Sequence, residues 1–434
     1  MADYDSDEEE NVKVPVKEPE VVEDATLANP DVVTKYQEAA KIVQAALLEV
    51  SAKAIAGARI VDIARFGDEL IEQRTNAIYK NKNKAGKVVS RGVAFPVCIS
   101  VNETVCHCSP LETDTEYAVL AADDIVKIDL GAHIDGFIVL AAHTVIVGQD
   151  AATAEAVATG RRAAVINATY TAAEVAAKLI KNGNSNSAVT AAIKQVADMY
   201  DVRPISGTLM HQMKQYVIDG KKMILLKELE QDQQKVEACT FETGEVYAID
   251  IAMSTGDGKP RDMGMRTTVY KRAVDQKYAL KNQASRAFFN EVNKRYPTLP
   301  FSTRSLPDEK AAKLGVRECV THGLMLPYPV LHERKGDFVA HTKFTVLLLP
   351  NGTLQITGLP PVTFNALVAS GKVSAEGVQT LNGNIGKILF EQYQAENPDA
   401  KLPENIAEIL NEKKPENKKK AKKAAKAAAA VATA

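Results

Sequence analysis

Two distant segments of the chain share one pattern, and this repeat constrains the fold more than any other feature. IVKIDLGAHIDG (125–136) and EVYAIDIAMSTGDG (245–258) are both apolar runs of strand type with an aspartate at the same point, followed by a turn that contains glycine. The two aspartates are Asp129 and Asp250, and a helical stretch precedes each run. The repeat predicts two related α+β halves, each contributing an acidic strand residue to a shared centre.

The periodicity of the remaining chain agrees with a mixed fold. Apolar residues at three- and four-residue spacing predict helices over 32–65, starting near Asn29–Asp31, where Asn29 or Asp31 provides a cap. An alanine-rich stretch over 151–199 predicts two more helices, broken at 181–184. Residues 131–136 are expected to form a hairpin turn. Strands are expected over 94–101, 124–130, 136–147 and 337–349.

The charge of the chain is concentrated at its ends. The 434 residues have a net charge of −2, but residues 1–24 hold ten Asp and Glu against two Lys, and residues 411–434 hold eight Lys against two Glu. The body between them is neutral, so the ends carry the electrostatic preference for partners. We expect a disordered acidic tail over 1–30, a folded domain over 31–398 and a basic Lys/Ala-rich tail over 399–434.

Several classes of protein are excluded by absent features. No apolar run approaches the roughly 18–20 residues of a membrane span, so we expect no membrane insertion. The acidic N-terminus lacks the apolar stretch of a secretory signal, and five sparse cysteines indicate free thiols in a reducing compartment. The glycine-containing runs at 256–259 and 182–187 lack the context of a phosphate-binding loop. In the run Cys106-His107-Cys108, neighbouring side chains point to opposite faces of a strand, which disfavours zinc.

Asp129, Asp250 and His211 are candidate ligands of a hard metal, because carboxylates on rigid strands typically hold two divalent cations. The alternative is that each aspartate only accepts hydrogen bonds from backbone donors at the end of its strand. On spacing alone, the second interpretation is favoured.

Basic segments are candidate contacts for nucleic acid, since lysine and arginine side chains bind phosphates without sequence preference and with strong salt dependence. They lie in a loop over 73–91, in the run 271–295 and in the C-terminal tail. The alternative is a solvated surface that only keeps the protein soluble. The candidate residues are Lys80, Lys82, Lys84, Lys87, Lys271, Arg272, Lys418, Lys419, Lys420, Lys422 and Lys423.

Five segments in the same order resemble the proliferation-associated, ErbB-receptor-binding protein family, whose members are non-peptidase relatives of type 2 methionine aminopeptidases. The resemblance spans about residues 31–390 and implies the pseudo-symmetric pita-bread fold of the aminopeptidases, with a helical insertion over 270–330. The segments are AFPVCISVNETVCHCSP (94–110), VKIDLGAHIDGFI (126–138), HQMKQYVIDGKK (211–222), EVYAIDIAMSTGDGK (245–259) and AHTKFTVLLLPNG (340–352).

The resemblance also implies what has become of the peptidase site. The peptidases bind their metals with two Asp, one His and two Glu, and these positions fall here on Asp129, Leu140, His211, Asp250 and Lys343. His107 matches the histidine on their substrate side. Leucine supplies no ligand, and a lysine puts a positive charge where the cations would lie. We therefore expect an ion pair in place of the metal, no cofactor and no catalytic residue.

The implied function is that of an inactive relative which binds ribosomes, ribosomal RNA and other structured RNA, and regulates ribosome biogenesis, translation and cell growth. The expected locations are the cytoplasm and the nucleus with its nucleolus, with further protein partners in growth signalling. Alternatives are a DNA-binding transcriptional co-regulator, a protein scaffold, or a working metallo-aminopeptidase with altered ligands.

Overall fold

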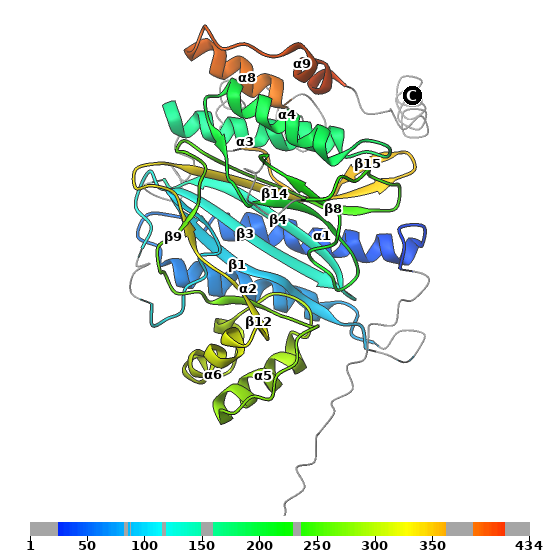
Figure 1. The fold of residues 1–434 in the computed structure, drawn as a ribbon, viewed down its shortest axis with the longest axis vertical. Helices are drawn as coiled ribbons and strands as arrows, with labels where there is room; N and C mark the ends of the chain where they lie inside the picture. Colours follow the sequence, from blue (N-terminus) through cyan, green and yellow to red (C-terminus); the bar gives the residue numbers. More distant parts are fainter. Residues whose placement is uncertain are drawn as a thin grey trace, which may run out of the picture.

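One large antiparallel sheet organises the molecule (Figure 1). The computed structural model of the chain describes residues 25–81, 86, 88–114, 119–148, 159–228, 236–361 and 385–412. The sheet has nine strands in the order β1-β3-β4-β14-β8-β6-β7, with β15 beside β14 and β5 beside β8. Its strands are β1 (Arg91–Val101), β3 (Ile125–Ile134), β4 (Phe137–Ile146), β5 (Arg203–Pro204), β6 (Leu209–Met213), β7 (Met223–Leu225), β8 (Val246–Ser254), β14 (Val339–Leu349) and β15 (Gly352–Gln355).

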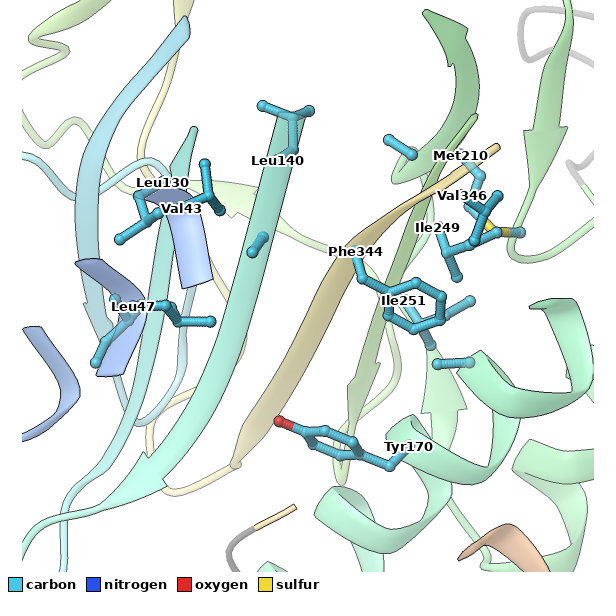
Figure 2. Close-up of a cluster of buried hydrophobic side chains, with 14 of the residues drawn as sticks. Val43, Leu47, Leu130, Leu140, Tyr170, Met210, Ile249, Ile251, Phe344 and Val346 are labelled. Atoms are coloured by element: carbon cyan, nitrogen blue, oxygen red, sulfur yellow. The ribbon is translucent and has the colours of Figure 1, made fainter. Parts of the chain in front are cut away.

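Four helices cover one face of this sheet. They are α1 (Pro30–Ser51), α2 (Ile60–Ala77), α3 (Gly160–Leu179) and α4 (Asn186–Met199). Helices α1 and α2 contact β1, β3 and β4, whereas α3 contacts β8 and β14. Figure 2 shows Val43 and Leu47 of α1 beside Leu130, and Tyr170 of α3 beside Phe344. Because side chains alternate along a strand, Asp129, next to Leu130, belongs to the face that these helices leave free.

The predicted α+β fold with two related halves is confirmed. Strands β3 and β8 carry Asp129 and Asp250 and occupy corresponding places on either side of the central pair β4–β14. Each half has its own pair of helices, α1–α2 or α3–α4. The repeat therefore corresponds to two half-sheets that join at one antiparallel pair.

Local sequence signals account for several element boundaries. Asn29 caps α1, since its Oδ1 accepts a hydrogen bond from the backbone N–H of Asp31 at 2.9 Å. The expected break between α3 and α4 is present, and Ser185 caps α4. The expected turn over 131–136 was too long. Residues up to Ile134 pair with β4, and the turn is only Asp135-Gly136, both at positive φ (55° and 77°).

The segment expected as an insertion forms a small module of its own. Helices α5 (Gln283–Arg295) and α6 (Glu309–Thr321) pack on the sheet β11-β10-β12, at the bottom of Figure 1. These strands are β10 (Val269–Arg272), β11 (Phe301–Ser302) and β12 (Met325–Tyr328), and the short helix η2 (Thr303–Ser305) follows β11. A separate hydrophobic cluster, which includes Phe288, Phe301 and Val316, forms its core.

Two C-terminal helices extend the packed structure past the boundary expected at residue 398. Helix α8 (Ile385–Glu396) and helix α9 (Glu404–Asn411) lie against α3, and α9 buries Ile406 and Leu410. Helix α9 packs because its apolar residues lie on one face, which the overall composition of the segment does not reveal. Most of the expected tails, 1–24 and 413–434, lies outside the described residues. None of the helices in the described ranges is both long and apolar enough to cross a membrane.

Candidate functional site

A row of residues crosses the centre of the sheet on the face opposite the helices. Asp129 on β3 and Lys343 on β14 both lie opposite Ala142 on β4, and Lys343 in turn lies opposite Asp250 on β8. Directly opposite residues of neighbouring strands point to the same face. The sheet register thus brings together, from both halves, two aspartates and a lysine.

Lys343 joins the two aspartates. Its Nζ lies 2.6 Å from Oδ2 of Asp129 and 3.0 Å from Oδ2 of Asp250. All three residues are buried, with 6–8 % of their surface exposed. A buried ammonium between two buried carboxylates forms charge-assisted hydrogen bonds with both, so its single positive charge offsets part of their two negative charges.

The charges of this row shift the proton equilibria of its members. Burial alone would lower the pKa of Lys343, but the two carboxylates outweigh burial and hold that pKa well above its usual value. Burial alone would raise the pKa of Asp250, but Lys343 and the hydrogen bond with His341 hold it far below its usual range. Lys343 and Asp250 therefore stay charged throughout the physiological pH range.

His341 belongs to the same cluster, although the sequence analysis did not select it. Its Nε2 lies 2.7 Å from Oδ1 of Asp250, so both oxygens of this carboxylate are engaged. His341 precedes Lys343 by two residues on β14, and strand alternation places both on one face. That spacing was the signal that could have identified it.

His211 lies on the same face but does not reach the ion pair. It pairs with Ala248 on β8, two residues before Asp250. Burial lowers the pKa of His211, and its Nδ1 has no hydrogen-bond partner among the described residues. His211 thus shares a sheet face with Asp129 and Asp250, but no hydrogen bond joins it to either aspartate among the described contacts.

Leu140 is packed where the resemblance places a carboxylate. It lies opposite Gly131 on β3 and is 1 % exposed. A Cβ atom on Gly131 would lie only 2.4 Å from Cδ2 of Leu140, so the leucine occupies the space above the glycine. The Thr345 hydroxyl accepts a hydrogen bond from the Leu140 N–H and donates one to its carbonyl. This position thus presents only hydrocarbon to the row.

Aromatic rings border the row on one side. His107 makes edge contacts with Tyr328, at 5.2 Å between ring centroids, and Phe95 lies 5.7 Å from Tyr328. The Lys343 ammonium lies 5.2 Å from the centre of the Phe95 ring. Burial lowers the pKa of His107 to about 4, so this imidazole is neutral at physiological pH. Phe95 and Tyr328 were not among the predicted site residues.

The cysteines beside His107 do not form a metal site. Cys106 Sγ lies 3.4 Å from His107 Nδ1, and all five cysteines are free. Burial raises the pKa of the Cys106 and Cys108 thiols to about 12, so neither is a thiolate at neutral pH. Within the described ranges, no group of three or more His, Cys, Asp or Glu side chains could hold a metal ion.

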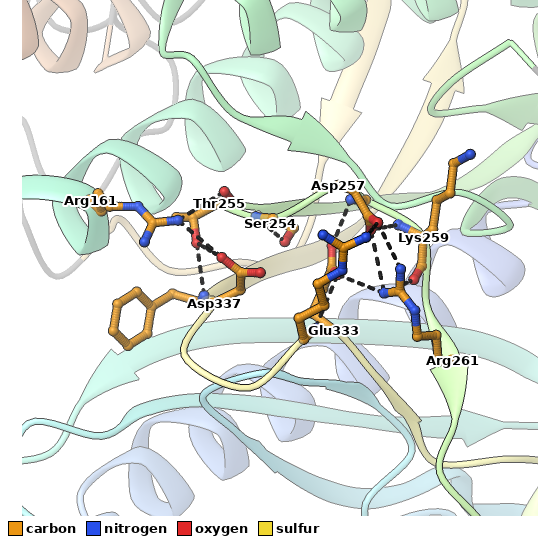
Figure 3. Close-up of polar contacts among 12 residues, drawn as sticks. Arg161, Ser254, Thr255, Asp257, Lys259, Arg261, Glu333 and Asp337 are labelled. Carbon is orange, nitrogen blue, oxygen red and sulfur yellow. Dashed lines mark hydrogen bonds and ion pairs between the residues drawn. The ribbon is translucent and has the colours of Figure 1, made fainter.

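The glycine-containing turn after β8 is filled by internal carboxylates (Figure 3). The N–H of Gly258 donates to Oε1 of Glu333 at 2.6 Å, and Arg261 donates to Asp257. Asp337 accepts hydrogen bonds from Arg161 and Thr255. These contacts hold the end of β8 next to the start of β14 and occupy the backbone donor of Gly258 that an anion would otherwise use.

The candidate nucleic-acid residues are exposed, held in internal contacts, or outside the described residues. Lys80 is exposed. Lys271 is paired with Asp219 at 2.5 Å, and Arg272 lies over the Phe289 ring with its pKa lowered by burial. The others are outside the described residues: Lys82, Lys84, Lys87, Lys418, Lys419, Lys420, Lys422 and Lys423.

The residues present do not fit the pair of divalent cations that peptidases of this architecture require. Lys343 places a fixed positive charge between Asp129 and Asp250. The Oδ2 atoms of both aspartates already contact its ammonium group. Leu140 contributes no donor atom. Bringing a dication beside this ammonium would oppose like charges inside a poorly hydrated site.

A sheet of two related halves, with helices on one face and a carboxylate-bearing row at the centre of the other, defines the pita-bread class of metallopeptidase-like proteins. The model of metallopeptidase family M24 matches residues 34–272. A solved structure entitled "Structure of a thermophilic Arx1" covers 89% of this chain and 99% of its own, with a TM-score of 0.74 and 29% identity.

Two relatives identify the family within this class. The chain is 51% identical over 332 residues to ERBB-3 binding protein 1 of Solanum tuberosum, covering 76% of this chain and 82% of the relative. It is 43% identical to proliferation-associated protein A of Dictyostelium discoideum, over 78% of this chain and 85% of the relative. The chain belongs to this family of ERBB-3 binding and proliferation-associated proteins, as its sequence motifs indicate.

Proposed function

We propose that this protein is a non-catalytic member of its family that binds ribosomes and structured RNA. The observation that carries the non-catalytic part is the contact of Lys343 with both Asp129 and Asp250. An internal ammonium supplies the positive charge between the carboxylates, and it can neither polarise a carbonyl group as a Lewis acid nor lower the pKa of a bound water as a metal does. The site then has a structural task, which is to join the two half-sheets.

The insertion module supports the RNA-binding part. Residues 270–330 contain eleven Lys and Arg against five Asp and Glu. Six of these cations are exposed and form no ion pair with any residue in the described ranges, so their charge is available to phosphates. They are Lys277, Lys281, Arg286, Lys294, Lys310 and Arg317. The basic loop around Lys80 and the lysine-rich tail would extend this surface.

The proposed roles follow from such binding. A protein held on ribosomal RNA by basic surfaces is positioned to regulate ribosome biogenesis and translation, and through them cell growth. This places it in the cytoplasm and in the nucleus with its nucleolus, where ribosomes work and are assembled. Protein partners in growth signalling would bind the same scaffold.

The absence of catalysis is tested on the purified full chain. We expect elemental analysis after dialysis to find no stoichiometric divalent metal, and we expect no release of methionine from a Met-Ala-type peptide in the presence of added Mn²⁺ or Co²⁺. Tightly bound metal together with turnover would overturn the proposal. A variant that combines Leu140→Asp with Lys343→Glu provides the metal-binding control.

Ribosome binding is tested by cosedimentation at increasing salt. Binding should weaken steeply with salt, because each phosphate contact releases counterions. Deleting residues 411–434, or replacing Lys80, Lys82, Lys84 and Lys87 with Gln, should weaken binding and flatten the salt dependence. Unchanged binding in both variants would refute the role of these basic surfaces. A duplex DNA of equal length, added as competitor, separates RNA binding from a DNA-directed role.

A protein scaffold is the second candidate, and one observation favours it. A relative that is 51% identical bears the name of an ERBB-3 binding protein. If the chain captures a receptor fragment at a salt concentration that removes it from ribosomes, the scaffold function stands independently of RNA.

A further inference from the structure

We propose that the stacked rings of Tyr278 and His322 are a binding site for an unpaired base of RNA. This proposal rests on the RNA binding proposed above and specifies which feature of the RNA the insertion module recognises. It requires an exposed aromatic surface, a fixed support for that surface, and cations beside it to hold the flanking phosphates.

The aromatic surface is a parallel stack on the outside of the module. The two rings lie 3.6 Å apart between centroids, with an angle of 10° between their planes. Tyr278 is 37 % exposed, and His322 is also exposed. Neither ring belongs to the hydrophobic core of the module, unlike the stacked pair Tyr296–Phe301.

The support for the stack is independent of the stack itself. The carboxylate of Glu318 on α6 accepts hydrogen bonds from the backbone N–H groups of Lys281 and Asn282, at 2.8 and 3.1 Å. Arg286 on α5 donates to the carbonyls of Leu280 and Lys281, both at 2.9 Å. These four bonds fasten the loop that carries Tyr278 to both helices. The loop therefore does not need the ring contact for closure, and the rings remain as a preorganised platform.

The cations near the platform favour a nucleic acid. The carboxylate of Glu318 also acts on His322, but both of its oxygens already accept hydrogen bonds from backbone N–H groups. Lys277 directly precedes Tyr278 in the sequence, and Lys281 follows it by three residues. Arg317 lies five residues before His322. All three are exposed and without an ion pair to any described residue. Water already solvates these exposed cations, so an apolar partner would gain nothing from them, whereas phosphates on either side of a stacked base would bind them and release counterions.

Unpaired bases suit this geometry better than a duplex. In a helix both faces of each base are already stacked, so an aromatic ring can meet only the end of the helix. A loop or bulge exposes the faces of its bases, and a stack of aromatic rings extends onto such a face whatever the base. The inferred ligand is therefore a single-stranded or looped segment of RNA.

The test uses the full chain and an RNA hairpin whose loop carries 2-aminopurine, a base whose fluorescence is quenched when it stacks. The matched control RNA is a blunt duplex of the same length and charge. Tyr278→Ala should weaken hairpin binding about tenfold or more and abolish the quenching. The salt dependence should stay unchanged, since no phosphate contact is lost. Tyr278→Phe, which keeps the ring, should behave as the wild type.

Two further variants separate stacking from charge. The pair Lys277→Gln and Lys281→Gln should reduce the salt dependence but leave the quenching at saturation intact. Leu314→Ala, which removes an exposed apolar side chain on α6, should have no effect. A hairpin that binds the Tyr278→Ala variant as tightly as the wild type, with equal quenching, would overturn the inference and leave general RNA binding standing. If polyphosphate of equal charge displaces the hairpin as well as unlabelled hairpin does, charge alone explains binding and the inference is also overturned. A wild type that binds neither RNA refutes the proposed function itself.

Discussion

Lys343 Nζ on β14 lies 2.6 Å from Asp129 Oδ2 on β3, across the intervening strand β4. The same ammonium reaches Asp250 on the other side, so one side chain ties together residues from both halves of the fold. In a metallopeptidase, bound cations would make this connection. Here the chain supplies its own cation, which makes the connection part of folding and independent of any ion in solution.

Lys343→Met should destabilise the protein strongly. The substitution leaves two carboxylates in a buried site without their counter-ion, and breaking a buried pair in this way typically costs about 3–5 kcal/mol. Urea denaturation followed by circular dichroism measures the change in the free energy of unfolding. Lys194→Met is the matched control, because the pair of Lys194 with Asp198 is exposed and such pairs contribute about 0–1 kcal/mol. If Lys343→Met lowers the free energy of unfolding less than the control does, the structural task of the row is contradicted.

Leu140→Asp combined with Lys343→Glu should create affinity for divalent cations. The double substitution removes the internal cation and places two carboxylates on the face that already carries Asp129, Asp250 and His211. Hard cations prefer such oxygen-rich sets. Isothermal titration with Mn²⁺ should show binding to this variant and none to the wild type. The uncharged counterpart, Leu140→Asn with Lys343→Gln, should bind no better than the wild type; equal binding by both variants would refute the explanation.

Lys127→Met should change how stability depends on pH. Lys127 is 1 % exposed, donates a hydrogen bond to the Asn102 carbonyl and has its pKa lowered by burial to about 7, despite the nearby acidic groups Glu103 and Asp124. Between about pH 7 and its ordinary value of 10.5, the unfolded chain therefore holds a proton that the folded chain has lost. In that window Lys127 makes the stability rise with pH, by at most about 1.4 kcal/mol per pH unit.

The measurement is the difference in the free energy of unfolding between wild type and Lys127→Met from pH 7 to 9.5. Taking the difference removes the part of the opposite contribution of the buried Cys106 and Cys108 thiols that both proteins share; these thiols resist deprotonation only in the folded state. The advantage of the wild type should grow with pH. A difference that is constant across the range would show that Lys127 titrates normally.

Arg304→Ala should loosen the insertion module from the large sheet. The Arg304 guanidinium is buried, lies 2.5 Å from Asp68 on α2 and donates to Ser109 and to the Pro110 carbonyl. Losing this buried pair should cost about 3–5 kcal/mol. Hydrogen exchange should show faster exchange of the amides in α5 and α6. Lys310→Ala, at an exposed position on α6, should leave the exchange unchanged, and equal exchange in both variants would contradict the anchoring role.

Sequence patterns predicted much of the fold because they report local geometry. The spacing of apolar residues located α1, the start of α2, α3 and α4, and apolar runs located β1, β3, β4 and β14. The loop expected over 73–91 was too long, because α2 continues to Ala77 and β1 begins at Arg91. The errors lie where contacts between segments distant in the sequence determine the structure. The hairpin turn shrank to Asp135-Gly136 because residues 131–134 pair with β4, and α9 packs past residue 398 because α3 offers it an apolar surface.

The candidate site was predicted in part for the same reason. Asp129 and Asp250 stand out as polar residues within apolar runs, and the family resemblance pointed to Lys343. His341, Phe95 and Tyr328 escaped notice because a histidine or an aromatic residue is common in buried strands. Only the sheet register shows that they face the same row.

By itself, the sequence determined the α+β class and the two related halves, and its family resemblance implied that positions 140 and 343 carry no metal ligand. The tertiary structure decided what Lys343 contacts. Lys343 and Asp129 are 214 residues apart, and no local pattern relates residues at that distance. Strand order and register bring them together, and burial turns their proximity into a strong interaction, because charges withdrawn from water must find one another.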